Sequence, residues 1–128
     1  MRILTLIIIL LILFNGCKRN EHNSTVGSKA MLTKDEIINI ATKVVVSQGF
    51  PIDSMDIYYD IENMEWEKTL LNLSKEDRNF AKQYTKELSG RSYQAVRYRP
   101  DITKIMSGDF WVFVDNKSGK VITFCGGL

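Results

Sequence analysis

Histidine and cysteine, on which many catalytic and metal sites depend, are nearly absent from this chain. Its 128 residues include one histidine, His22, and two cysteines. A lone histidine in a polar stretch near the start argues against a Ser-His-Asp triad or a Cys-His pair, and it excludes a multi-histidine metal site. Two cysteines are too few for a zinc framework. We therefore predict no catalytic residue, no cofactor and no metal site.

A surplus of charge of either sign is missing too. The chain has 17 basic and 15 acidic side chains, a formal net charge of +2. Because a clear basic surplus marks domains that bind nucleic acid, we expect no nucleic-acid partner. Internal repeats and low-complexity runs are absent from the sequence, and its length predicts one domain.

The one long hydrophobic run lies at residues 3–14, where only Thr5 interrupts it, directly after Met1 and Arg2. A membrane span needs about 20 apolar residues, so this run is short for that role. A short run behind a positive start is typical of the core of a signal peptide. The alternative is a short membrane anchor that is never cleaved.

Phe14-Asn15-Gly16-Cys17 follows this run and resembles the lipobox of bacterial lipoproteins. In that family a small residue precedes the cysteine, whose thiol is acylated and which becomes the first residue after cleavage. Gly16 and Cys17 match, whereas Asn15 and Phe14 depart from the commonest residues. The resemblance implies an anchor in the lipid bilayer of the cell membrane or outer membrane, with the domain facing the periplasm or the cell exterior.

Three regions follow from this interpretation. Residues 1–16 are the signal peptide, residues 17–30 are a polar, lipidated tether, and residues 31–128 form a single domain. Acylation of Cys17 would leave Cys125 without a partner in the chain. We expect Cys125 to be buried in a terminal strand, the alternative being an intermolecular disulfide.

Hydrophobic periodicity predicts an α+β domain. Thr33 and Glu36 form a capping box for a first helix that ends near Gly49, with Ile40 at the centre of its apolar face. The pattern then predicts a strand at 55–61, a helix within 63–73, a helix at 74–88, and strands at 92–99, 110–115 and 120–125. We expect the first helix to pack on a curved antiparallel sheet of about four strands, with a second helix inserted before the last strands.

The last two strands predict a hairpin around a turn at residues 116–119, whose Gly119 takes the left-handed position. In that register two sets of side chains lie on opposite faces. One set is Phe110, Val112, Val114, Ile122 and Phe124, and the other is Trp111, Phe113, Val121, Thr123 and Cys125. Both faces of the predicted strand at 110–115 are apolar. This strand is therefore either sandwiched between two layers or exposes Trp111 and Phe113 for binding.

Charged side chains cluster along the sequence. Between Asp53 and Glu67 there are six acidic residues and no base, and residues 68–104 carry nine bases against four acids. The run is either a solvated face with local ion pairs, a dipolar surface for a charged partner, or a source of paired carboxylates for glycoside hydrolysis. A nucleic-acid strip is also suggested by Arg91, Arg97 and Arg99 together with Tyr93 and Tyr98, but an exported lipoprotein would rarely use one.

Residues 108–122 are similar to the closing hairpin of two families. Their sequence is Gly108-Asp109-Phe110-Trp111-Val112-Phe113-Val114-Asp115-Asn116-Lys117-Ser118-Gly119-Lys120-Val121-Ile122. One is the exported peptidase-propeptide (PepSY-like) domains, and the other is the immunity proteins with a cystatin-like, nuclear-transport-factor-like fold. The helix at 74–88 favours the second family. That resemblance implies a non-enzymatic protein that binds and neutralises a protein partner, typically a toxin. The alternative is a structural or assembly lipoprotein of the envelope.

For such a partner we expect a contact surface that joins the acidic run to the aromatic face. Asp56 and Asp60 would lie at its rim and steer a basic protein. Trp111 and Phe113 would lie at its centre and supply most of the affinity.

The anchor can be tested directly. Replacing the acylated thiol by a hydroxyl, Cys17→Ser, should abolish fatty-acid labelling and release the protein from the membrane fraction. Acylation of the Cys17→Ser chain would contradict the anchor.

Overall fold

The computed structural model describes residues 30–101 and 108–128. Its elements follow in chain order. They are α2 (Lys34–Ser47), η1 (Ile52–Ser54), β1 (Met55–Tyr59), η2 (Ile61–Asn63), α3 (Met64–Asn72), α4 (Lys75–Leu88), β2 (Tyr93–Pro100), β3 (Phe110–Asp115) and β4 (Val121–Gly126). The predicted signal peptide, Cys17 and most of the predicted tether lie outside the described residues.

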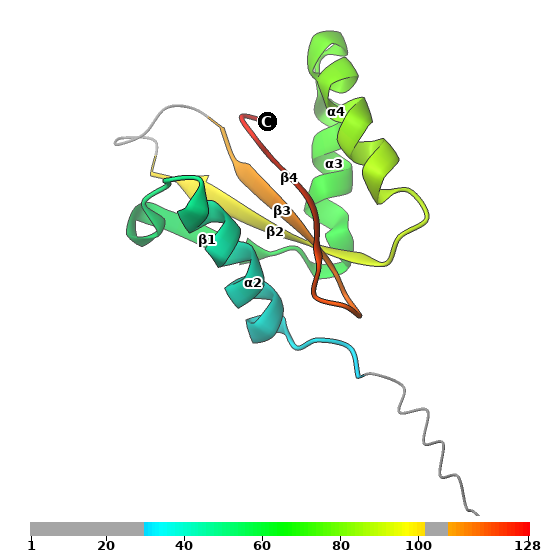
Figure 1. The fold of residues 1–128 in the computed structure, drawn as a ribbon. Coiled ribbons are helices and arrows are strands. Elements are labelled where there is room, and N and C mark those ends of the chain that lie inside the picture. Colours follow the sequence, from blue (N-terminus) through cyan, green and yellow to red (C-terminus); the bar gives the residue numbers. More distant parts are fainter. Residues whose placement is uncertain (1–29, 102–107) are drawn as a thin grey trace, which may run out of the picture.

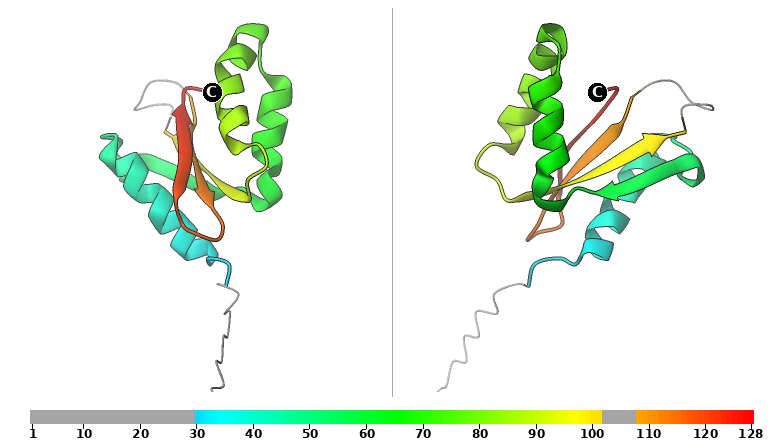
Figure 2. Two further views of the ribbon diagram at one scale, coloured as in Figure 1. Left: turned by 45° about the vertical axis from the view of Figure 1, so that its right-hand side comes forward. Right: turned by 180° about the vertical axis from the view of Figure 1, so that it is seen from behind.

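The four strands form one antiparallel sheet in the order β1-β2-β3-β4. Helix α2 lies on one face, and α3 and α4 lie on the other (Figures 1 and 2). This confirms the predicted α+β arrangement of a first helix on a four-stranded antiparallel sheet. The segment before β2 contains two helices, α3 and α4, which together form a third layer.

Helix α2 begins at the predicted capping box. The Glu36 amide donates to Thr33 Oγ1 at 3.3 Å, and the Thr33 amide donates to Glu36 Oε2 at 2.7 Å. Hydrogen bonds from the Thr33 amide and hydroxyl stabilise the charged Glu36 carboxylate and so lower its pKa. After α2, Gly49 has a φ of +84°, a backbone conformation that favours glycine, so the chain turns there toward β1.

Two separate cores lie on the two faces of the sheet. The core under α2 contains Ile37, Ala41, Val45, Val96, Tyr98, Phe110, Val112 and Val114. The core under α3 and α4 contains Trp66, Leu88, Ala95, Trp111, Phe113 and Cys125. Strand β3 contributes to both cores by alternation, and every side chain from Phe110 to Val114 is buried, so both helical layers cover it.

The register of the hairpin differs from the prediction at one point. Phe113 pairs with Thr123 but Val114 pairs with Val121, so Ile122 is an extra residue in β4. This bulge exchanges the faces of two side chains: Val121 packs on the α2 core and Ile122 on the other core. The rest of the predicted facing pattern is confirmed, as is the left-handed Gly119, with a φ of +72°.

Cys125 is buried on the α3/α4 side of the sheet and free of any disulfide. Burial raises the pKa of its thiol to about 12, because the thiolate would lose its hydration there. The prediction of a buried cysteine is confirmed.

The prediction that Ile40 lies at the centre of the apolar face of α2 is wrong. Ile40 is only half-buried at the margin of the core, and Ile37 is the fully buried residue at its centre. Truncation of each residue to alanine makes a matched pair on one helix. Ile37→Ala should lower the free energy of unfolding by about 2–4 kcal/mol through lost burial and a cavity, and Ile40→Ala by about 1 kcal/mol. Urea denaturation of both variants measures the difference. Equal losses would contradict the placement of α2.

Candidate functional site

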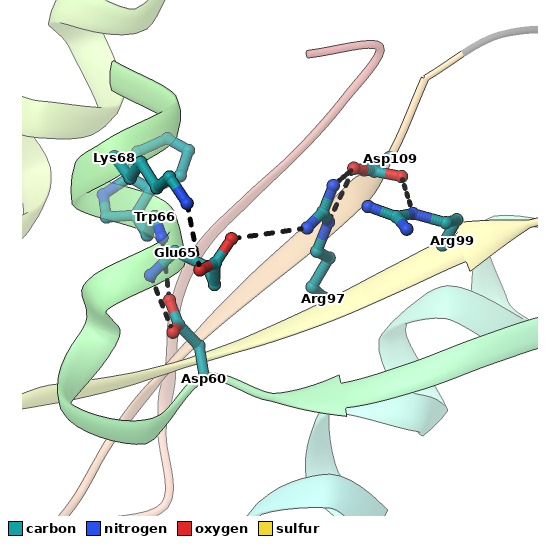
Figure 3. A network of polar contacts seen from close by, with 7 residues as sticks. All are labelled: Asp60, Glu65, Trp66, Lys68, Arg97, Arg99 and Asp109. Atoms are coloured by element: carbon teal, nitrogen blue, oxygen red, sulfur yellow. Dashed lines mark hydrogen bonds and ion pairs between the residues drawn. The ribbon is translucent and has the colours of Figure 1, made fainter. Parts of the chain in front are cut away.

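The corner between β1 and α3 is built around a buried carboxylate, Asp60. Its amide continues the pairing with β2 by donating to the carbonyl of Ala95 at 3.1 Å. Its carboxylate accepts from the amides of Glu65 at 2.9 Å and Trp66 at 2.8 Å, which belong to the first turn of α3 (Figure 3). Amides in the first turn of a helix lack partners within the helix, so Asp60 caps α3 from outside.

Asn63, also at this corner, extends the strand pairing with its side chain. Its amide nitrogen donates to the carbonyl of Tyr93 at 2.9 Å, and its amide oxygen accepts from the amide of Ala95 at 2.7 Å. Asn63 and the preceding Glu62 have φ values of +58° and +56°. Two consecutive left-handed residues are costly, and these hydrogen bonds offset part of that cost. The corner therefore places the start of α3 firmly against β2.

Arg97 and Arg99 lie beyond the part of the sheet that α3 covers, and both contact Asp109. Arg97 Nε donates to Asp109 Oδ2 at 2.6 Å, and its Nη2 donates to the same oxygen. Arg99 Nε lies 3.5 Å from Asp109 Oδ1 (Figure 3). The guanidinium of Arg97 also lies 5.3 Å from the centre of the Trp111 ring, so Arg97 is held on two sides.

Glu65 links this cluster to α3. Its Oε2 lies 4.0 Å from Arg97 Nη1, and its Oε1 lies 3.8 Å from Lys68 Nζ (Figure 3). Arg99 is more accessible than Arg97, with 46% of its side chain exposed against 18%. It stacks 5.6 Å above the Tyr58 ring and is the more available of the two arginines to a partner.

A groove of about 480 Å³ runs along this cluster. Exposed apolar and aromatic side chains, Tyr58, Ile61 and Met64, line it together with Glu65 and the two arginines. Apolar surface beside oriented charges is the chemistry of a recognition surface.

The carboxylates of this region are already engaged. Asp60 accepts two helix amides, and Asp109 holds two guanidinium groups. Neither Asp60 nor Asp109 is therefore free to act as one of the two catalytic carboxylates of a glycosidase. Within residues 30–101 and 108–128 there is no group of three acidic, histidine or cysteine side chains that could hold a metal ion.

Of the four residues predicted to contact a partner, one is exposed in the structure and three are buried. Asp56 is exposed on β1, opposite Arg99 in the register, and so remains a candidate. Asp60 is buried in the cap of α3 and is unavailable as a rim charge. Trp111 and Phe113 are fully buried against Trp66, at ring distances of 5.4 and 4.6 Å. Their predicted role in contacting a partner is therefore wrong, and the alternative of a sandwiched strand is confirmed.

The groove itself was not predicted, although one signal for it is present in the sequence. The side chains of β2 that face α3 and α4 run from Tyr93 and Ala95 to Arg97 and Arg99. An apolar face that turns charged within one strand indicates where the covering helices stop. Which residues would flank the two arginines depends on the position of α3, which no local pattern gives.

No family model, curated protein or solved structure matches the chain in the three comparisons made. In the described part of the chain, no helix is long and apolar enough to cross a membrane.

The cap on α3 gives a test of this corner. Asp60→Ala leaves two amides without their acceptor and should lower the free energy of unfolding by about 1–3 kcal/mol. Asp60→Asn keeps one acceptor oxygen and should lose less. Thermal unfolding of both variants measures the effect. Stability of Asp60→Ala within about 0.3 kcal/mol of the parent would show that the cap is unimportant.

Proposed function

We propose that the chain is a lipid-anchored protein of the bacterial cell envelope that binds and neutralises a protein partner without catalysing a reaction. The anchor is the acylated Cys17, supported by the apolar run that ends in Gly16 and Cys17. The binding element is the domain that follows the tether, as in the immunity proteins that its closing hairpin resembles.

The groove at Arg99 is the observation that carries this proposal. Ile61 is 70% exposed and Met64 62% exposed, yet both are apolar and stand beside the half-exposed Tyr58. Exposed apolar side chains grouped around a groove favour association with another protein. These residues take the central role that Trp111 and Phe113 were expected to have.

The polar surroundings of the groove support binding rather than reaction. Arg97 and Asp109 hold each other in place, and Arg99 is positioned by the ring of Tyr58 and by Asp109. Such a preorganised guanidinium loses little side-chain entropy when it donates hydrogen bonds to carbonyl oxygens of a partner. Glu65 at the groove and Asp56 at the neighbouring hollow are exposed acids that steer a basic partner.

The test is site-specific photocrosslinking in the bacterium of origin. A photoreactive amino acid replaces Ile61 at the groove or, as a matched control, the exposed Val46 on α2, which lies on the other side of the sheet. We expect one discrete protein adduct from position 61 and none from position 46. Equal adducts at both positions, or none at either, would contradict a partner in the groove and leave the structural-lipoprotein alternative.

Affinity for the crosslinked partner should then depend on the groove. Tyr58→Ala removes the ring beneath Arg99 and should weaken binding by roughly tenfold or more if Tyr58 is a hot spot. Phe80→Ala, which truncates an exposed aromatic residue on α4, serves as the control and should leave the affinity unchanged. Both variants are compared with the parent by calorimetry.

A further inference from the structure

Strand β1 is the last strand on its side of the sheet, and one of its edges has no neighbouring strand among the described residues (Figure 2). The amide of Asp60 donates to Ala95, and the carbonyl of Ser54 accepts from Asp101. Backbone groups alternate along an antiparallel strand, so Asp56 and Tyr58 also point their amides and carbonyls toward β2. Ile57 and Tyr59 consequently point theirs toward the open edge.

The helical layers cover β1 only in part. Met55 and Tyr59 pack against the α2 core, and Nζ of Lys34 on α2 lies 5.7 Å from the centre of the Tyr59 ring. The side chain of Ile57 lies on the α2 side of the sheet and is 39% exposed, and Tyr58 lies on the opposite side and is 45% exposed. The middle of β1 therefore exposes apolar side chains on both faces of the sheet, without the cover that proteins usually give an edge strand.

The opposite edge of the sheet is better protected. Strand β4 carries the bulge at Ile122, and α4 packs against it. A bulge twists an edge strand away from regular pairing. Strand β1 pairs with β2 without a bulge over its whole length, so it offers a regular template for another strand.

The charges near β1 indicate which kind of strand could pair with its open edge. Six acidic residues and no base lie between Asp53 and Glu67, the segment that contains β1 and the start of α3. All of them except Asp60 are exposed. Two copies of the chain paired through β1 would bring two such segments together, and their repulsion disfavours that dimer. A cationic segment is complementary to the exposed acids, because Arg97 and Arg99 on the neighbouring strand are already held by Asp109.

We propose that the free edge of β1 takes up an extended, cationic segment of another protein as a fifth strand of the sheet. The inference rests on the proposed function and specifies how the partner is held. Main-chain hydrogen bonds to Ile57 and Tyr59 supply affinity, and the exposed acidic side chains select lysine and arginine. Every second side chain of the added strand would lie on the α3 side of the sheet, next to Asp56 and Tyr58 of β1.

Synthetic peptides test this mode with the full acylated chain in an uncharged detergent. The probe is a decapeptide of alternating lysine and valine, and its controls are a glutamate–valine decapeptide and a lysine–valine decapeptide with every backbone amide methylated. We expect both controls to bind at least roughly tenfold more weakly by fluorescence anisotropy. Equal binding of the methylated peptide would overturn the inference, because that peptide keeps the charge and lacks the amide donors.

Hydrogen exchange gives a second readout on the unchanged protein. The amides of Ile57 and Tyr59 should exchange quickly in the free chain and become protected when the lysine–valine peptide is bound. Binding without protection in β1 would also overturn the inference. An adduct at position 61 together with an unprotected β1 would separate the two proposals, since the groove would then bind a partner without strand addition.

A pair of variants at one position completes the test. Ile57→Pro removes an amide that points away from β2, a position where an edge strand tolerates proline. Ile57→Val keeps the amide and the branched side chain. We expect Ile57→Pro to weaken peptide binding by roughly tenfold and Ile57→Val to leave it within about twofold. Equal affinities for two folded variants would contradict pairing at this edge.

Discussion

The structure depends on covering both faces of strand β3. The side chains from Phe110 to Val114 are all buried, and they alternate between two cores. A strand of this kind is stable only between two layers, since exposure of either face would place large apolar surface in water. Helix α2 supplies one layer, and the pair α3 and α4 supplies the other.

The corner at Asp60 determines how far the second layer extends. By capping α3 next to Ala95, Asp60 fixes the point where that helix begins. On this face of the sheet the first half of β2 therefore lies under helices, and its second half, with Arg97 and Arg99, lines the groove. On the other face α2 covers Tyr98. The groove follows from the same limit, because α3 leaves the far end of the first two strands uncovered on its own face of the sheet.

Features governed by neighbouring residues could be predicted from the sequence. The capping box of Thr33 and Glu36, the start of α4 at Ser74 and the left-handed Gly119 all rest on contacts within a few residues. The alternation in β3 likewise predicted its two apolar faces.

Features governed by distant contacts could not be predicted in the same way. Asp60 resembles its acidic neighbours in the sequence, and only the packing of α3 makes it a buried cap. Trp111 would serve equally well in a core or on a surface until Trp66 is placed against it. The bulge at Ile122 escaped prediction because the hairpin turn is compatible with either register.

The late place of β3 in the chain has a consequence for the order of folding. During synthesis α2, β1, α3, α4 and β2 are all made before Phe110, and until then each core lacks the apolar side chains that β3 supplies to it. Each helix alone can bury little surface, so a nascent chain that ends before β3 can complete neither core. Both cores are completed only once β3 has emerged, which places the decisive packing step late in synthesis.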